Sequence, residues 1–73
     1  MTVTVDIYIE DAADQIADYD TIRLYRGSDP SVYPFTGLPV TTATLVSTTL
    51  AYSLTDANGT ANSYYRYSLY NSS

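Results

Sequence analysis

Apolar and polar residues alternate strictly in the first ten positions of the chain. Val3, Val5, Ile7 and Ile9 are separated by threonine, aspartate and tyrosine within residues 2–9. A period of two places these four side chains on one face of an extended strand, and their β-branched shape suits that conformation. The pattern therefore predicts a β-strand with one buried face.

The same alternation returns in the segment "TIRLYRG", residues 21–27. Here Ile22 and Leu24 are predicted to point inward, and Arg23 and Tyr25 outward. A second strand is therefore expected in this segment.

Three more strands are expected in the second half of the chain. The segment "TATLVSTT", residues 42–49, is predicted to be a short edge strand, and residues 50–56 alternate again with Leu50, Tyr52 and Leu54 on one face. In the last segment, "YYRYSLY", the side chains predicted inward are Tyr65, Tyr67 and Leu69, and those predicted outward are Tyr64, Arg66, Ser68 and Tyr70. We expect Tyr52, Tyr65 and Tyr67 to belong to the core.

Three segments interrupt the strands. Residues 11–20 show helical spacing, and we expect one or two helical turns there with Asp11 as the N-cap. Residues 28–41 hold all three prolines, which lack a ladder donor, so an exposed loop is predicted. Asn58 and Gly59 form a dipeptide typical of a turn in which a positive φ is easily adopted.

These elements predict an all-β fold, a small β-sandwich of about five strands with one short helical turn. We expect residues 1–73 to form a single domain, and the initial methionine to mark a complete small reading frame. A chain of 73 residues has a small core, and without cysteine or histidine it has neither a disulfide nor an ordinary zinc or copper site. Assembly with other subunits or very good packing would then have to stabilise it.

Several segments resemble a fibronectin type III domain, an immunoglobulin-like module. The segments "TVDIYIE" at 4–10, "YDTIRLYRGS" at 19–28, "TLVSTTLAYSLTD" at 44–56 and "YYRYSLYN" at 64–71 are similar to its second to sixth strands. The resemblance implies that Tyr65 is the corner tyrosine, whose hydroxyl binds upstream backbone. It also implies that the strands at 21–27 and 64–70 are neighbours.

The chain departs from that family in two ways. The tryptophan usual on the second strand is absent, and no sequence remains for the first or the seventh strand. We therefore expect the strand at 64–70 to have a free edge, which is a template for pairing with another chain. Either a partner covers this edge, or the protein's own N-terminal strand pairs with it.

Charge excludes several classes of partner. The net charge is −5, with three arginines and no lysine, so nucleic-acid binding and docking to an anionic membrane are not expected. No window is apolar enough to cross a bilayer, so no membrane insertion is expected. The N-terminal segment has no basic region and no continuous apolar run, so it is not predicted to be a signal peptide.

Catalysis is not expected either. The chain has no histidine, cysteine or lysine to act as base or nucleophile, and a hydroxyl needs an adjacent base to be activated. No catalytic residue, cofactor or metal site is therefore predicted. The acidic residues Asp11, Asp14, Asp18 and Asp20 could offer oxygen ligands to calcium, but their spacing is not that of an EF-hand, and a helix cap on a solvated face is the preferred interpretation.

The nine tyrosines are the most unusual feature of the composition. Those predicted to point outward share a face with arginines, and tyrosine and arginine are the residues that interfaces favour. High β-propensity is the alternative explanation for tyrosines on a sheet surface. The candidate interface residues are Arg23, Tyr25, Tyr33, Phe35, Tyr64, Arg66 and Tyr70.

Three functions remain open at this point. Short, lysine-free, Thr/Ser/Tyr-rich chains with "YDTIRLYR" and similar segments resemble small virion proteins of tailed bacteriophages, which implies a head decoration, tail or fibre module acting in many copies. Its partners would be further copies or other virion proteins, and its location the virion, assembled in the host cytoplasm. The alternatives are a carbohydrate-binding or adhesion module that stacks tyrosines on surface glycans, with an extracellular location, and a secreted inhibitor-type domain that uses the proline-rich loop.

Overall fold

The computed structural model describes residues 1–27 and 38–72. In this part of the chain it contains five β-strands and one short helix, so the predicted all-β fold is confirmed. The strands are β1 (Val3–Tyr8), β2 (Thr21–Gly27), β3 (Thr41–Thr44), β4 (Ala51–Asp56) and β5 (Tyr64–Tyr70), and the helix is α1 (Ala12–Gln15).

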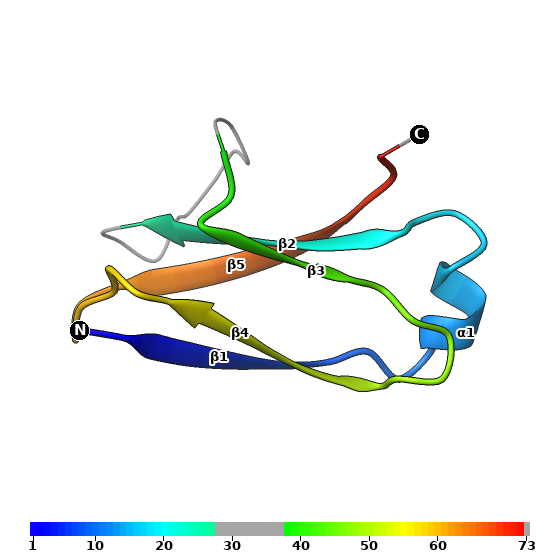
Figure 1. The fold of residues 1–73 in the computed structure, drawn as a ribbon, viewed down its shortest axis with the longest axis horizontal. Helices are drawn as coiled ribbons and strands as arrows, with labels where there is room; N and C mark the ends of the chain where they lie inside the picture. Colours follow the sequence, from blue (N-terminus) through cyan, green and yellow to red (C-terminus); the bar gives the residue numbers. More distant parts are fainter. Residues whose placement is uncertain (28–37, 73) are drawn as a thin grey trace.

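The strands form two antiparallel sheets that pack face to face (Figure 1). One sheet consists of β1 and β4, and the other has the order β3-β2-β5. β2 and β5 are neighbours, as the sequence predicts, with Leu24 opposite Tyr67. The N-terminal strand pairs with β4, with Val5 opposite Leu54. The alternative in which the N-terminal strand pairs with the edge of β5 is therefore wrong.

Burial follows the predicted alternation most clearly in β4. Tyr52, Leu54 and Asp56 are buried, and the residues between them are exposed. In β2, Ile22 and Leu24 are fully buried between the sheets. The period of two thus identifies the face that each of these strands turns toward the core.

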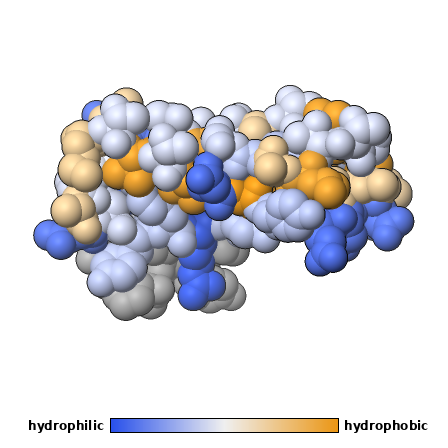
Figure 2. Space-filling view, turned by 90° about the horizontal axis from the view of Figure 1, so that it is seen from below, coloured by the Kyte–Doolittle hydropathy of each residue, from blue (hydrophilic) through white to orange (hydrophobic). Residues whose placement is uncertain are grey.

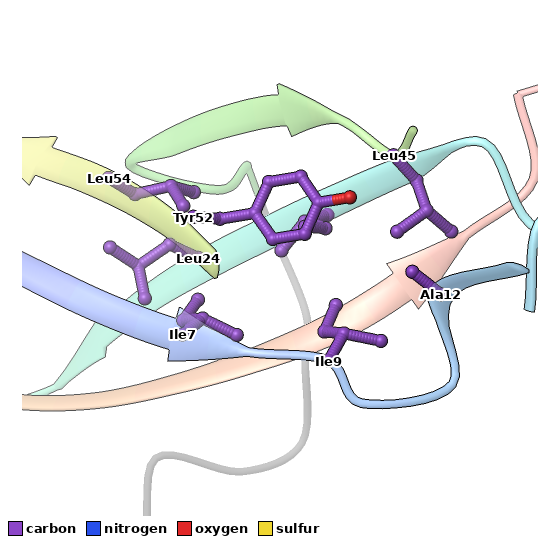
Figure 3. Packing of buried hydrophobic residues seen from close by; sticks show 8 residues of the cluster. Ile7, Ile9, Ala12, Leu24, Leu45, Tyr52 and Leu54 are labelled. Carbon is purple, nitrogen blue, oxygen red and sulfur yellow. The ribbon is translucent and has the colours of Figure 1, made fainter. Parts of the chain in front are cut away.

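The core fills the space between the two sheets (Figure 3). Its buried members are Ile7, Ile9, Ala12, Ile22, Leu24, Leu45, Tyr52 and Leu54. Tyr52 is amphipathic in this position, because its ring is in the core while its hydroxyl accepts the Val46 N–H at 3.0 Å and donates to the Thr49 carbonyl at 2.7 Å. The hydroxyl thereby holds the connection between β3 and β4.

Helix α1 lies at one end of the sandwich, in the connection from β1 to β2 (Figure 1). Asp11 occupies the N-cap position, as predicted, but its side chain makes no capping hydrogen bond. Its carboxylate instead accepts a hydrogen bond from Gln15 Nε2 at 2.8 Å. The helix is held by Ala12, which is completely buried against the core.

The predicted loop at residues 28–41 lies mostly outside the described residues. At its described end Leu38 is 92% exposed, as expected of a loop. Val40, however, packs against the core, and its N–H donates to the Leu24 carbonyl at 2.8 Å. The prediction that the loop continues to residue 41 is therefore wrong, because pairing with β2 already begins at Val40.

Within the described residues, no helix is long and apolar enough to span a membrane.

Candidate interaction site

The predicted Tyr/Arg face lies on the outer side of β2 and β5. Arg23 is at its centre: the guanidinium carbon lies 3.4 Å from the centroid of the Tyr70 ring. On the other side, Arg23 Nη1 donates a long hydrogen bond of 3.4 Å to the Tyr25 hydroxyl. A cation over an aromatic face contributes about 0.5–1 kcal/mol at an exposed site. These three side chains therefore contact one another rather than standing free.

The remaining predicted interface residues differ in their exposure to solvent. Tyr25 is only 6% exposed, so it cannot serve as a free contact surface, although it lies on the predicted outer side of β2. Tyr64 and Arg66 are exposed near the start of β5, where Tyr64 faces Gly27 in register. Tyr33 and Phe35 lie outside the described residues.

A second surface is the open side of the sandwich, defined by the free edges of β1 and β5. β3 lies next to β4, and β3 and β5 are the opposite edges of one sheet. β5 is therefore on the same side of the molecule as β1, and within the described residues no strand pairs with the outer edge of either. On the side where β1 lies, apolar surface forms a row along the long axis (Figure 2).

Tyr67 shows the effect of this open side most clearly. It lies opposite Leu24, which is completely buried, so the two residues share the inner face of their sheet. Tyr67 is nevertheless 46% exposed, and the prediction that it belongs to the core is wrong. The direction of the side chain agrees with the predicted alternation, but the side chain is only about half covered. The flanking inner residues Tyr65 and Leu69 are partly buried against the core.

An ion pair with a buried carboxylate connects three strands. Asp56 of β4 is 4% exposed and accepts hydrogen bonds from Arg26 Nη1 of β2 at 2.7 and 2.9 Å. It also accepts one from the Tyr65 hydroxyl of β5 at 3.0 Å and one from the Asn58 N–H at 3.0 Å. A buried carboxylate is tolerated only when it is paired and hydrogen-bonded in this way. The group joins the two sheets.

This group shifts the pKa values of its members. Burial by itself raises the pKa of Asp56, but the hydrogen bonds from Arg26, Asn58 and Tyr65 outweigh it and leave the pKa below its usual value. Burial and the hydrogen bond to the carboxylate raise the pKa of the Tyr65 hydroxyl. Tyr65 binds a side chain nine residues upstream, so its predicted role as a corner tyrosine bound to backbone is corrected.

Arg26 and Asp56 are not among the site residues predicted from the sequence, although the alternating pattern places both at inward positions. Asp56 continues the inward series of Tyr52 and Leu54, and Arg26 continues the inward series of Leu24. A charged residue at an inward position requires a partner of opposite charge. Because Arg26 and Asp56 each occupy an inward position at the end of a strand, the pattern indicates that they form an ion pair.

At the other end of the molecule, Asp20 holds the chain beyond β5. Its carboxylate accepts hydrogen bonds from the Ser72 hydroxyl at 2.6 Å and from the Thr21 hydroxyl at 2.7 Å. These bonds lower the pKa of Asp20. Across the described ranges, no group of three or more acidic side chains is placed to hold a metal ion.

Comparison of the chain with protein-family models, with curated proteins and with solved structures gives no match. The fold and the two surfaces thus define a small all-β module with an incompletely covered core.

Proposed function

We propose that this chain is a non-enzymatic interaction module that binds another protein chain by strand addition on its open side. The observation that carries the proposal is the inner-face Tyr67, 46% exposed between two free strand edges on the same side of the sandwich. An added strand would pair with β5 and cover this ring.

The edge of β5 suits such a partner. In an antiparallel sheet, every second residue of an edge strand directs its N–H and C=O away from the sheet. β5 has seven residues and one charge, Arg66, which is weak protection against pairing. In strand addition the backbone supplies affinity and the alternate side chains supply specificity, and the partly buried Tyr65 and Leu69 would contact those of the partner.

We place this module in a virus particle, as a head decoration, tail or fibre protein in many copies. The support for this setting is the sequence resemblance to small phage virion proteins. Strand addition to an open sandwich suits a particle built from repeated contacts between chains.

The geometry favours this function over carbohydrate binding by the Tyr/Arg face. A sugar stacks on a bare aromatic face, but the guanidinium of Arg23 covers one face of Tyr70 and the Tyr25 ring is buried. The two rings at the centre of that face are thus already in contact with protein atoms.

The proposal can be tested by NMR titration of the ¹⁵N-labelled protein with a synthetic strand-forming peptide of alternating valine and threonine. We expect shifts of the β5 and β1 amides, and their loss in Tyr67→Lys, which places a charge on the inner face of the edge. Tyr8→Lys is the matched control, because Tyr8 is exposed on the outer face of β1. Shifts confined to Arg23 and Tyr70, or no shifts when millimolar peptide is added to protein dilute enough to be monomeric, would contradict the proposal. A shift of the Tyr70 amide signal on addition of a soluble oligosaccharide would favour the carbohydrate-binding function.

A further inference from the structure

We infer that the chain covering β5 is a second copy of this protein, paired antiparallel about a two-fold axis that passes through Tyr67. The inference rests on the proposed function and names the partner. The joined sheets would have the order β3-β2-β5 followed by the same strands of the second copy in reverse.

The register of β5 is self-complementary. A two-fold axis at Tyr67 aligns all seven residues of the strand, because Tyr67 is its central residue. Tyr65 then lies opposite Leu69 of the second copy, and the two Tyr67 side chains lie opposite each other. Residues directly opposite in an antiparallel pair share a face, so the apolar inner faces of the two copies become continuous.

Charge favours the β5 edge for self-association. The chain has a net charge of −5, but residues 57–73 contain no acidic residue. In the proposed register Arg66 lies opposite Ser68 of the second copy, so no like charges are directly opposed. The free edge of β1 is less suitable, because it carries Asp6 and is followed by Glu10 and Asp11.

The exposed ring of Tyr67 gives the contact its driving force. This side chain is directed to the inner face but is 46% exposed in the single chain. In the pair, each Tyr67 ring would be covered by the other, while the outward N–H and C=O groups of β5 become hydrogen-bonded. An isologous contact of this kind closes at two copies on the β5 edge.

Cysteine cross-linking tests the register directly, because the wild-type chain has no cysteine. Opposed residues in an antiparallel pair have Cα atoms about 4.5–5.5 Å apart, within the range of a disulfide. Tyr67→Cys should therefore form an intermolecular disulfide under mild oxidation. Tyr64→Cys is the matched control on the same strand, because Tyr64 and Tyr67 are similarly exposed. In the proposed register, residue 64 of one copy would lie about 20 Å from residue 64 of the other, at about 3.4 Å per residue. Tyr64→Cys should form little or no disulfide.

Sedimentation of the full chain provides the second measurement. We expect twice the monomer mass of 8.0 kDa at high concentration, and the monomer mass for Tyr67→Lys with an unchanged circular dichroism spectrum. A wild-type monomer up to submillimolar concentration, or equal cross-linking of Tyr64→Cys and Tyr67→Cys, would overturn the inference. If the wild-type protein stays monomeric but binds the alternating peptide at β5, the second copy is excluded as the partner and the proposed function stands. If it binds neither a second copy nor the peptide, the inference and the proposed function both fail.

Discussion

Asp56 connects the two sheets through its carboxylate. It is buried, and it receives hydrogen bonds from β2, from β5 and from the turn that follows β4. Arg26 supplies the opposite charge at 2.7 Å. Removing Arg26 would leave the buried carboxylate with fewer hydrogen bonds, which is the costly case for a buried charge.

The lowered pKa of Asp56 predicts a loss of stability in acid. A carboxyl whose folded-state pKa lies below its unfolded value of about 3.9 stabilises the protein fully above that pH, and this contribution is lost as the pH falls through the folded value. Asp20 contributes with the same sign. Urea midpoints measured from about pH 7 to about pH 2.5 should therefore fall, and Asp56→Asn should be less stable at neutral pH and less sensitive to acid. Parallel pH curves for Asp56→Asn and wild type would contradict this account.

Gly59 is required for a close approach rather than for an unusual backbone angle. Its φ lies outside the left-handed region, so the expected reason for a glycine in this turn does not apply. A Cβ at this position would collide with the Tyr65 hydroxyl and would lie 2.6 Å from Val3 Cγ2. The absence of a side chain therefore lets the turn pack between β1 and β5.

We predict that Gly59→Ala destabilises the protein by about 1–3 kcal/mol, the usual cost of overpacking. Chemical denaturation would measure the loss. In a Val3→Ala, Tyr65→Phe background, the two closest atoms are gone and only Val3 Cβ remains, at 3.0 Å, so the additional cost of Gly59→Ala should be smaller. An undiminished cost in that background would mean that the backbone conformation, and not the contact, excludes alanine.

At the scale of elements, β1 is half of its sheet. Val3, Val5 and Ile7 oppose Asp56, Leu54 and Tyr52 across the pair, and Ile9 continues it by donating to the Leu50 carbonyl at 2.8 Å. β4 has no other hydrogen-bonded neighbour among the described residues. The sheet exists only because these two strands pair.

We therefore predict that deleting residues 2–5 unfolds the domain rather than loosening one end. The deletion removes most of the pairing of β1 and two side chains, Val3 and Val5, on its inner face. Loss of the far-ultraviolet β signal and of the cooperative thermal transition would show the effect. Deletion of residues 71–73, which follow β5, is the control and should leave a cooperative transition. A folded protein after the first deletion would show that β4 finds another partner.

At the scale of the whole molecule, the sandwich is closed on one side and open on the other. β3 and β4 lie next to each other on the closed side, and on the open side no described strand pairs with the outer edge of β1 or β5 (Figure 1). The chain is small, so its core has little stability to spare for exposed inner-face residues such as Tyr67. Covering this side by another chain would link assembly to stability by mass action.

The local pattern of the sequence predicted the strands and the direction of most side chains. The period of two identified β1, β2, β4 and β5, because a strand with one buried face must alternate. The inward positions of Ile7, Ile22, Leu24 and Leu54 follow from the same local rule.

Which of those inward positions are covered depends on how the two sheets pack together. Tyr67 has the same local pattern as Leu24, but burial depends on whether a second layer lies above a residue, and that layer comes from distant parts of the chain. The pairing of Arg26 with Asp56 and the close approach of Gly59 to Val3 likewise join residues that are far apart in the sequence. A one-dimensional pattern specifies the face that a side chain occupies, whereas its partners are set by the packing of the two sheets.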